Sequence, residues 1–236
     1  MQNEFSRTEL LFGSEGMKKL RSCRVAVFGV GGVGGYAVEA LARSGIGTLD
    51  LIDHDTVSLS NLNRQIIALH STIGKYKVDV AKERILDICP ETKVNAFRCF
   101  YLPETEHLFD FQNYDYIIDA IDTVTGKMAI IKNAQTAGTP VISSMGAGNK
   151  LDPTAFRVAD IYQTQVCPLA RTIRRECRKA GIQKLKVVYS EELPATLKGE
   201  LQENPDTHKP VPASVAFVPS TAGLILAGEV IKDLLQ

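Results

Sequence analysis

The sequence predicts an α/β fold with a doubly wound, mostly parallel sheet and a C-terminal extension of strands and helices. Three observations support this prediction. Strand and helix patterns alternate through the first 150 residues, as they do in βαβ units. Two of the later strands are continuous apolar runs, which is typical of strands buried on both faces of a parallel sheet. A glycine-rich turn also joins the first strand to the helix that follows it.

The elements of the first half are assigned in order from local pattern. Strands are predicted where apolar and β-branched residues run together, and helices where apolar residues recur every three or four positions, as Val78, Ala81, Ile85 and Ile88 do. The predicted elements are a helix at 15–20, a strand at 25–30, a helix at 33–44, a strand at 48–52, a helix at 75–88, strands at 94–97 and 116–120, a helix at 125–137 and a strand at 141–144.

After Gly148 the pattern changes, and an extension of the core is expected. Its predicted elements are a strand at 156–161, a basic helix at 169–180, a strand at 186–189 and a final apolar helix at 222–235. Residues 191–212 combine five prolines or glycines with many charges and no apolar period, which predicts a mobile surface loop. We therefore expect one domain over 1–236, with a nucleotide-binding core at 7–150 and a substrate-side extension at 151–236.

Composition limits the classes of protein that fit. The 236 residues are 44% hydrophobic, and basic and acidic residues number 27 each, which argues against a polybasic nucleic-acid coat or an acidic tail. The five cysteines include no C-x-x-C pair, which argues against a disulfide framework or a four-cysteine zinc site. No apolar run is long enough to span a bilayer, and the first residues lack a leader-like apolar region. We expect a cytoplasmic protein without a membrane span.

The glycine-rich turn indicates a nucleotide site. Gly29 permits a tight turn, Gly31 and Gly32 let backbone N–H groups approach a phosphate, and Gly34 lets helix and strand pack closely. Asp53 ends the next strand, about 20 residues further on, where a carboxylate accepts hydrogen bonds from a ribose. The strand before the turn, the helix after it and this carboxylate together make a nucleotide-binding βαβ unit the favoured interpretation.

Charged residues beyond the second strand indicate which nucleotide binds. A dinucleotide is held mainly by the glycine turn and the ribose carboxylate, whereas Arg64 and Lys77 supply cations for a triphosphate. Asp122 follows a strand at the ligand-binding edge and could hold Mg²⁺ against the phosphates. Each residue alone also has a plainer interpretation, as a solvated cation or as a cap of the next helix. Taken jointly they favour ATP with Mg²⁺.

These residues fall in sequence blocks that resemble the E1-like superfamily of ATP-dependent carboxylate-adenylating enzymes. The blocks are G-x-G-G-x-G at 29–34, D-x-D-x-V-x-x-S-N-x-x-R-Q at 53–65, G-x-x-K at 74–77 and the strand-ending Asp122. The resemblance implies a Rossmann-like adenylation domain with Lys77 on the phosphates and Mg²⁺ at Asp122. It implies further nucleotide contacts from Gly31, Asp53, Asp55, Asn61, Arg64 and Gln65.

The N-terminal segment extends this resemblance. Residues 7–13, RTELLFG, are similar to the R-Q-x-x-L-x-G segment of the superfamily. In dimeric members its arginine reaches the phosphates bound by the partner subunit. The resemblance therefore implies a homodimer with shared ATP sites, in which Arg7 completes the site of the other subunit.

The second half favours one branch of the superfamily. Members that activate ubiquitin-like or sulfur-carrier proteins commonly have two C-x-x-C zinc pairs and often a thioester-forming cysteine, and this chain shows neither feature. It instead resembles the tRNA threonylcarbamoyladenosine dehydratases in five segments, at 152–154, 168–171, 174–182, 188–191 and 217–223. This branch implies that ATP adenylates the threonyl carboxylate of a modified adenosine beside the anticodon of tRNA, with release of pyrophosphate. The same side chain then closes a ring with loss of AMP.

In that reaction the catalytic residues implied are Arg64, Lys77 and Asp122, which stabilise charge on the phosphates. No protein nucleophile is needed because the attacking group is tethered to the carbonyl that it attacks. The substrate implied is tRNA bearing threonylcarbamoyladenosine, and a sulfur-relay protein is left open as a further partner.

A run of cations in the second half has two interpretations. Arg171, Arg174, Arg175 and Arg178 fall at helical spacings and are followed by Lys179, Lys184 and Lys186. Such a helix face could meet several RNA phosphates, or it could be an ordinary solvated face. The residues alone leave both open, and the family resemblance favours tRNA binding by Arg171, Arg174, Arg175, Arg178 and Lys179.

Two other functions stay open from the sequence. One is an adenylyltransferase for a ubiquitin-like or sulfur-carrier protein, which would form an adenylate on the carrier's C-terminal glycine. The other is a nucleotide-sensing or scaffold protein without turnover, in which ATP only orders the dimer. The missing zinc cysteines disfavour the first of these, and trapping of a carrier adenylate would favour it.

Overall fold

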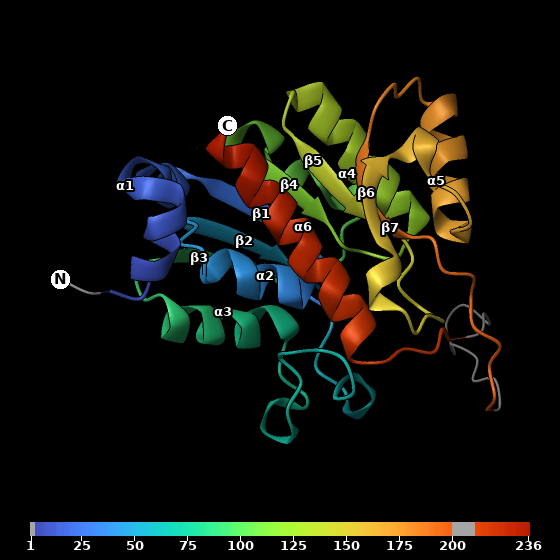
Figure 1. The fold of residues 1–236 in the computed structure, drawn as a ribbon, viewed down its shortest axis with the longest axis horizontal. Coiled ribbons are helices and arrows are strands. Elements are labelled where there is room, and N and C mark those ends of the chain that lie inside the picture. Colours follow the sequence, from blue (N-terminus) through green and yellow to red (C-terminus); the bar gives the residue numbers. More distant parts are fainter. Residues whose placement is uncertain (1–2, 200–210) are drawn as a thin grey trace.

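The computed structural model describes residues 3–199 and 211–236 and contains a seven-stranded sheet covered by helices on both faces (Figure 1). The strand order is β3-β2-β1-β4-β5-β7-β6, with all neighbours parallel except β6, which runs antiparallel to β7. The predicted doubly wound, mostly parallel sheet is confirmed. The strands are β1 Arg24–Phe28, β2 Thr48–Ile52, β3 Lys93–Phe97, β4 Tyr116–Asp119, β5 Val141–Ser144, β6 Phe156–Asp160 and β7 Lys186–Ser190.

Six α-helices flank the sheet within the described ranges. Helices α1, α2, α3 and α6 share a hydrophobic core with one face, while α4 and α5 pack on the other face. Short 3-10 turns at 103–108 and 111–113 complete the second layer beside α4. The helices are α1 Ser6–Ser22, α2 Gly34–Ala42, α3 Lys77–Ile88, α4 Val124–Ala137, α5 Pro168–Lys179 and α6 Phe217–Leu235.

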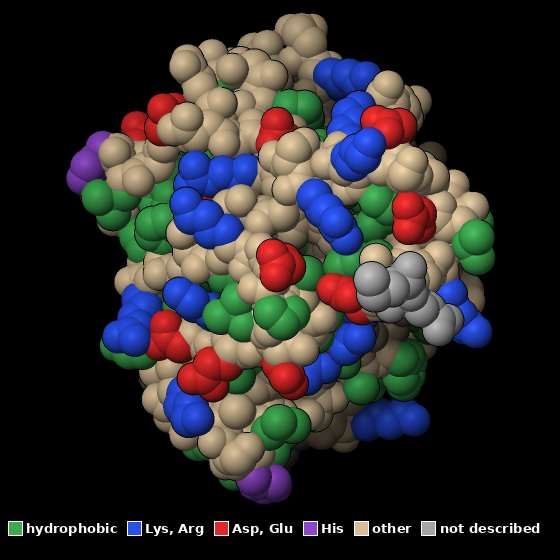
Figure 2. Space-filling view, turned by 90° about the vertical axis from the view of Figure 1, so that its left-hand side faces the viewer, with side chains coloured by type: hydrophobic (Ala, Val, Ile, Leu, Met, Phe, Trp, Pro, Cys, Tyr) green, Lys and Arg blue, Asp and Glu red, His purple; other side chains and the backbone are tan. Residues whose placement is uncertain are grey.

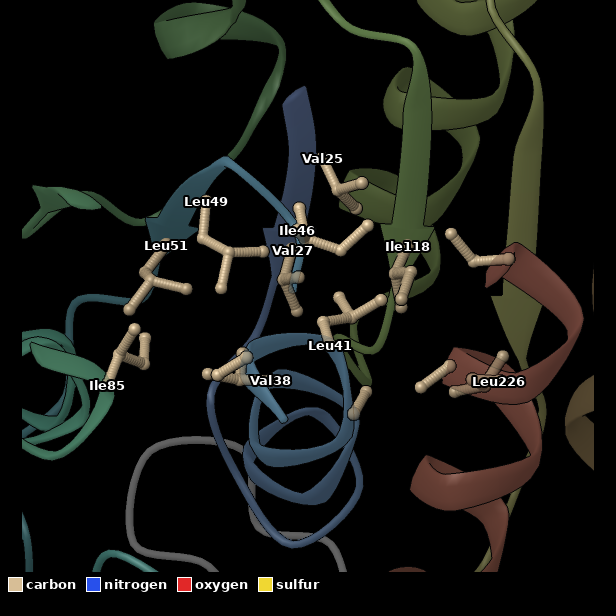
Figure 3. Packing of buried hydrophobic residues seen from close by; sticks show 14 of the residues in the cluster. Val25, Val27, Val38, Leu41, Ile46, Leu49, Leu51, Ile85, Ile118 and Leu226 are labelled. Carbon is tan, nitrogen blue, oxygen red and sulfur yellow. The ribbon is translucent and has the colours of Figure 1, made fainter. Parts of the chain in front are cut away.

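Alternation along the strands explains why both layers form. In β1, Val25 and Val27 belong to the core under α2 and α6, whereas Ala26 and Phe28 belong to the core under α4. Figure 3 shows Val25 and Val27 beside Leu41 of α2, with Leu226 of α6 at the side of the same cluster. Because successive side chains of a strand point to opposite faces, an apolar run such as β1 requires cover on both.

Helix α6 crosses the sheet and closes the fold against the start of α2. A Cβ atom at Gly223 would lie 2.2 Å from the carbonyl oxygen of Val33, so only glycine allows this approach of the two backbones. At its other end α6 is held by Asp233, which accepts hydrogen bonds from Tyr116 and Lys186. These contacts place the first turns of α6 beside the glycine-rich turn, and the ribbon in Figure 1 shows its long diagonal path.

Most predicted elements are confirmed to within a few residues, and two helices are longer than predicted. Helix α1 spans Ser6–Ser22 because two helical segments join across a break at Gly13, whose φ is 71°. Helix α6 begins at Phe217, ahead of the predicted Ala222. Pro219 does not prevent this earlier start, because proline is tolerated in the first turn of a helix. In the predicted loop 191–212, residues 191–199 and 211–212 contain no helix or strand, and 200–210 lie outside the described residues. No described helix is long and apolar enough to cross a membrane.

Candidate nucleotide-binding site

The residues predicted to bind nucleotide meet at the carboxyl edge of the sheet. Strands β1 and β4 are neighbours although they are far apart in sequence, so the strand order reverses between them. The loops after β1, β2 and β4 all leave at this edge, and such a switch point is where open α/β sheets bind ligands. The structure therefore brings the turn at 29–34, the segment at 53–65 and Asp122 to one side of the molecule.

The glycine-rich turn has two positions that fix its shape and two that leave room for a ligand. Gly29 has a φ of 90°, and a Cβ atom at Gly34 would lie only 1.8 Å from the carbonyl oxygen of Gly29. A Cβ atom at Gly31 would meet nothing closer than 3.8 Å, and one at Gly32 nothing closer than 3.4 Å. Gly31 and Gly32 are thus not required by packing, and an open backbone at the N-terminus of α2 suits a phosphate.

Asp53 is held against this turn by its own hydrogen bonds. One carboxylate oxygen accepts from the backbone N–H of Val30 at 2.7 Å, and the other accepts from the N–H of Asp55 at 2.9 Å. These contacts orient a half-buried carboxylate at the mouth of the turn. Each oxygen keeps a lone pair for a ribose hydroxyl, as the sequence analysis predicts.

The segment after β2 includes a short 3-10 turn at Leu59–Asn61, which carries Asn61 and is followed by Arg64 and Gln65. Asn61 is buried and its side-chain oxygen accepts from the N–H of Ser58, so it shapes the segment. The Cγ atom of Arg64 lies beside Gly32, and its guanidinium donates to the carbonyl of Ser60 and to Oδ1 of Asn63. Gln65 is only 7% exposed, and its Oε1 atom is a buried acceptor without a partner among the described atoms. A buried polar atom of this kind indicates a missing ligand or water.

Lys77 begins α3 and lies under the loop that carries Asp55. The lysine is only 5% exposed, and its Nζ donates to a carboxylate oxygen of Asp55 at 2.6 Å. The imidazole Nε2 of His54 lies 3.2 Å from the other oxygen of Asp55. Asp55, from the sequence block at 53–65, thus positions the Lys77 ammonium. Contact of either residue with a nucleotide stays a prediction.

Asp122 lies in the loop between β4 and α4 and its side chain is exposed. The alternative role as a helix cap is not borne out, because the N-cap of α4 is Thr123 and no side chain caps this helix. The Oγ1 atom of Thr123 is buried and has no partner among the described atoms. The Asp122 carboxylate is exposed on the loop beside the glycine turn. Mg²⁺ in nucleotide sites is held by one or two carboxylates together with phosphate oxygens, so this residue fits a metal ligand.

Arg7 is the one predicted nucleotide contact that the fold keeps away from this edge. It is exposed on the first turn of α1, two residues after the buried Phe5. Phe5 packs near Gly45, just ahead of β2 and therefore at the amino edge of the sheet. Arg7 therefore lies at the amino edge of the sheet, away from the glycine turn at the carboxyl edge.

The basic helix is α5, and the structure separates its cations. Arg171 and Arg175 are exposed, with Arg175 and Lys179 both paired to Glu176 on the surface. Arg174 is different, since its guanidinium donates to the carbonyl and hydroxyl oxygens of Thr164. Arg174 therefore anchors the helix, and the tRNA-binding prediction for it is the weakest of the set.

Of the three remaining cations of the run, Lys184 is exposed, and Arg178 and Lys186 each contact other side chains. The guanidinium of Arg178 stacks over the ring of Tyr162, with 5.5 Å to its centroid. Lys186 lies on β7 and is paired with Glu229 and Asp233, so it is not part of the exposed face. On the side of the molecule shown in Figure 2 basic and acidic side chains are interspersed, whereas α5 concentrates cations on one helix.

A groove of about 580 Å³ lies between α4 and α5. Its lining includes Val124, Thr125 and Lys132 of α4 and Glu176 and Lys179 of α5, and none of the predicted nucleotide-binding residues lines it. Cys177 of α5 is buried, and burial raises the pKa of its thiol to about 11, so the thiol stays protonated near neutral pH.

Sequence reasoning missed two features of this edge. His54 lies with Asp53 and Asp55 in the one group of three potential metal ligands found among the described residues. Lys127 is completely buried and paired with Asp119. A lysine in a helical pattern is normally solvated, so local spacing gives no signal for such a residue.

Comparison with known proteins identifies the family. The family model described as "ThiF family" matches residues 5–236. The chain belongs to the ThiF family. A Bacillus subtilis relative named tRNA threonylcarbamoyladenosine dehydratase is 47% identical over all of this chain and 96% of its own length. The resemblance to the E1-like dehydratases is confirmed by this match.

Solved structures agree with this placement in the ThiF family. The Escherichia coli tRNA N6-threonylcarbamoyladenosine dehydratase in complex with AMP superposes with a TM-score of 0.90 at 32% identity, over 98% of this chain and 94% of that one. The complex of the same enzyme with ATP gives a TM-score of 0.89 at 32% identity, over 98% and 93% of the two chains. These ThiF-fold neighbours bind the nucleotide that the geometry favours here.

Proposed function

We propose that this chain is an ATP-dependent tRNA threonylcarbamoyladenosine dehydratase. ATP adenylates the threonyl carboxylate of the modified adenosine beside the anticodon, and a new acyl–phosphate bond forms as pyrophosphate leaves. A heteroatom of the same carbamoyl group then attacks the activated carbonyl, AMP leaves and one proton is released. The sum of both steps removes one water from the side chain.

One observation carries this proposal more than any other. The glycine turn, Asp53, Gln65, Lys77 and Asp122 come from four separate sequence blocks and meet at one edge of the sheet. A protein that bound a nicotinamide dinucleotide would need the turn and the carboxylate alone. The choice of tRNA as substrate is supported by the full-length likeness to relatives that carry this name.

Three residues take electrostatic roles in the proposed reaction. Arg64 and Lys77 stabilise the charge that develops on the α-phosphate and on departing pyrophosphate, and Asp55 holds Lys77 in position. Asp122 would hold Mg²⁺, which neutralises charge on the phosphate oxygens when it is bound. Ring closure needs little more than a fixed geometry, since tethering alone can supply roughly 7–11 kcal/mol of the barrier.

Recognition of tRNA is assigned to α5 and to the groove beside it. The exposed Arg171, Arg175 and Lys179 would meet phosphates of the RNA backbone, with a smaller part for Arg178 and least for Arg174. The groove between α4 and α5, which Lys132 and Lys179 line, would take part of the RNA beside these contacts.

A homodimer with shared sites explains the place of Arg7. Its distance from the glycine turn in one subunit fits a residue that serves the partner's phosphates. The exposed Leu10 and Leu11 on the same helix would be covered by such a contact. Mixing inactive Arg7→Ala and Asp122→Ala chains should restore about a quarter of native activity, because half of randomly mixed dimers contain one intact site. No recovery would contradict shared sites.

The remaining expectations concern setting and partners. We infer a reducing, cytoplasmic setting, which the five unpaired cysteines support. A sulfur-relay protein remains a proposed partner.

The decisive assay uses the purified chain with tRNA bearing threonylcarbamoyladenosine, ATP and Mg²⁺. Mass spectrometry of the nucleosides should show loss of one water from the modified adenosine, with release of pyrophosphate in equal amount. A carrier protein added in place of tRNA should give no pyrophosphate. Formation of a carrier adenylate, or ATP binding without any turnover, would contradict the proposal.

A further inference from the structure

A completely buried lysine lies directly behind the loop that carries Asp122. Lys127 is in the first turns of α4, and both its side chain and that of Asp119 are 0% exposed. Its Nζ donates to Asp119 at 3.0 Å and to the carbonyl oxygen of Ser144 at 2.7 Å. Removing two charges from water costs free energy that offsets most of their attraction, so stability alone does not explain why such a pair is buried here.

The contacts of this pair span both ends of one loop. Asp119 is the last residue of β4 and Lys127 belongs to α4, so their ion pair brackets the four residues of 120–123. Asp119 also accepts from the N–H of Ile121 inside the loop, at 3.4 Å. A second side chain joins from β5, where the hydroxyl of Ser143 donates to Asp119 at 2.5 Å. The network thus fixes the loop to two strand ends at once.

The same loop forms a wall of the glycine turn. The N–H of Ala120 donates to the carbonyl of Phe28, and a Cβ atom at Gly29 would lie 2.8 Å from the carbonyl oxygen of Ala120. A Cβ atom at Gly34 would meet the side chain of Ala120 at 3.3 Å. A shift of the loop would therefore change the distance between Asp122 and the phosphate-binding backbone.

We propose that Lys127 is a positioning residue that fixes Asp122 relative to the glycine turn. This inference rests on the proposed function, in which Asp122 holds the metal of Mg–ATP. Lys127 touches neither nucleotide nor metal, and it acts through Asp119, Ser143 and the loop between them. It is distinct from Arg64 and Lys77, which the proposed function places on the phosphates.

The test compares ATP binding with and without Mg²⁺ in the absence of RNA. Titration calorimetry should show that Mg²⁺ strengthens ATP binding to the wild type, and that Lys127→Met reduces this gain at least tenfold while binding in EDTA stays unchanged. Asp122→Asn should remove the gain, and the Lys127→Met/Asp122→Asn chain should be no worse than Asp122→Asn alone. Such non-additivity is expected only when one residue acts through the other.

A matched variant at the other end of the sheet separates positioning from general stability. Arg24 also pairs with a fully buried aspartate, Asp50, and Arg24→Met should lower stability while leaving the Mg²⁺ gain as in the wild type. If Lys127→Met does not fold, Ser143→Ala removes one hydrogen bond of the same network and should give a smaller loss with the same non-additivity.

Hydrogen exchange gives a second readout that needs no ligand. Amide exchange over 119–126 should become faster in Lys127→Met and Ser143→Ala, and stay unchanged in Arg24→Met. Unchanged exchange in that segment, or additive losses with Asp122→Asn, would overturn the inference while leaving the proposed function intact. A wild type without any Mg²⁺ gain would instead overturn the metal role of Asp122, and the inference with it.

Discussion

The two edges of the central sheet use the same residue types in opposite ways. In the amino half of the sheet the acids are fully paired: Asp50, in the middle of β2, accepts from Arg24, Asn95 and Tyr114, and Asp233, at the amino edge, accepts from Tyr116 and Lys186. At the carboxyl edge Asp122 is exposed, and Gln65 and Thr123 keep buried polar atoms without partners in the described structure.

The difference shows that stability and ligand binding are separated along the strands. Polar groups at the amino edge join strands to α6 and to each other, so their hydrogen bonds are complete without a ligand. At the carboxyl edge the exposed or unpaired polar groups lie on the loops that follow the strands, where they are ready to bind, and the buried Lys127–Asp119 pair behind them is complete. Substitutions at the amino edge should therefore change stability, and substitutions of the loop residues at the carboxyl edge should change chemistry.

The largest effect is expected at the carboxyl edge. Asp122→Ala and Arg64→Ala should each lower turnover on modified tRNA by about 10²–10³-fold or more, because transition-state charge loses a stabilising group. Urea midpoints should stay within error of the native chain, since neither side chain is buried. Asp87→Ala is the control and should keep full activity, because Asp87 lies in the last turn of α3, at the amino edge of the sheet. Unfolding of the Asp122 variant would place that residue with the structural acids.

The second effect is expected in the amino half of the sheet. Asp50→Ala should lower the free energy of unfolding by about 3 kcal/mol, because it leaves buried hydrogen-bond donors unpaired. Urea denaturation measures this change, and titration of ATP at a temperature where the variant is folded should give native affinity. A matching loss of ATP affinity would show that the two edges are not independent.

A third, smaller effect is expected on α5. The double variant Arg171→Ala/Arg175→Ala should weaken tRNA binding about tenfold and lower the slope of binding against salt by about 2, as expected when two phosphate contacts are lost. Filter binding at several salt concentrations measures both. Lys18→Ala/Lys19→Ala removes two exposed cations of α1 and should change neither quantity, and an unchanged slope for the α5 variant would exclude that helix.

The smallest effect is a pH dependence at the amino edge. Burial opposes ionisation of Asp233 and Glu229, but the net pKa of both carboxyls is lowered, by hydrogen bonds from Tyr116 and Lys186 to Asp233 and from Lys186 and Lys232 to Glu229. Carboxyl groups with lowered pKa values stabilise the fold above their ordinary pKa, and this stability is lost as pH falls through the lowered values.

Without Lys186 the pKa values of these carboxyls should be lowered less. The loss of stability between pH 7 and pH 3 should therefore be smaller in Lys186→Met, by only about 1 kcal/mol because the ion pairs are partly exposed. Urea midpoints at both pH values measure it, with Lys18→Met as the control for an exposed pair. An unchanged acid loss in Lys186→Met would contradict the assignment.

Much of this comparison could be predicted from the sequence, and the rest depends on contacts between distant segments. Strands such as β2 and β5 were predicted to the residue, because apolar β-branched runs between turn signals carry the information locally. The glycine turn and Asp53 were placed correctly at one edge for the same reason.

Other features have no local signal. The start of α6 depends on its packing against α2 at Gly223, and the burial of Lys127 depends on β4 and β5, which are separate segments. The hydrogen bond from Arg174 to the carbonyl of Thr164 likewise joins residues ten positions apart across a turn. In each case tertiary contacts decide what the residue type leaves open.

The central claim is that the carboxyl edge binds the triphosphate of ATP. A crystal structure of the protein soaked with ATP and Mg²⁺ tests it most directly. The account predicts phosphate density over Gly31 and Gly32, ribose density at Asp53 and a metal beside Asp122. An empty edge, or a nicotinamide compound bound there in preference to ATP, would contradict it.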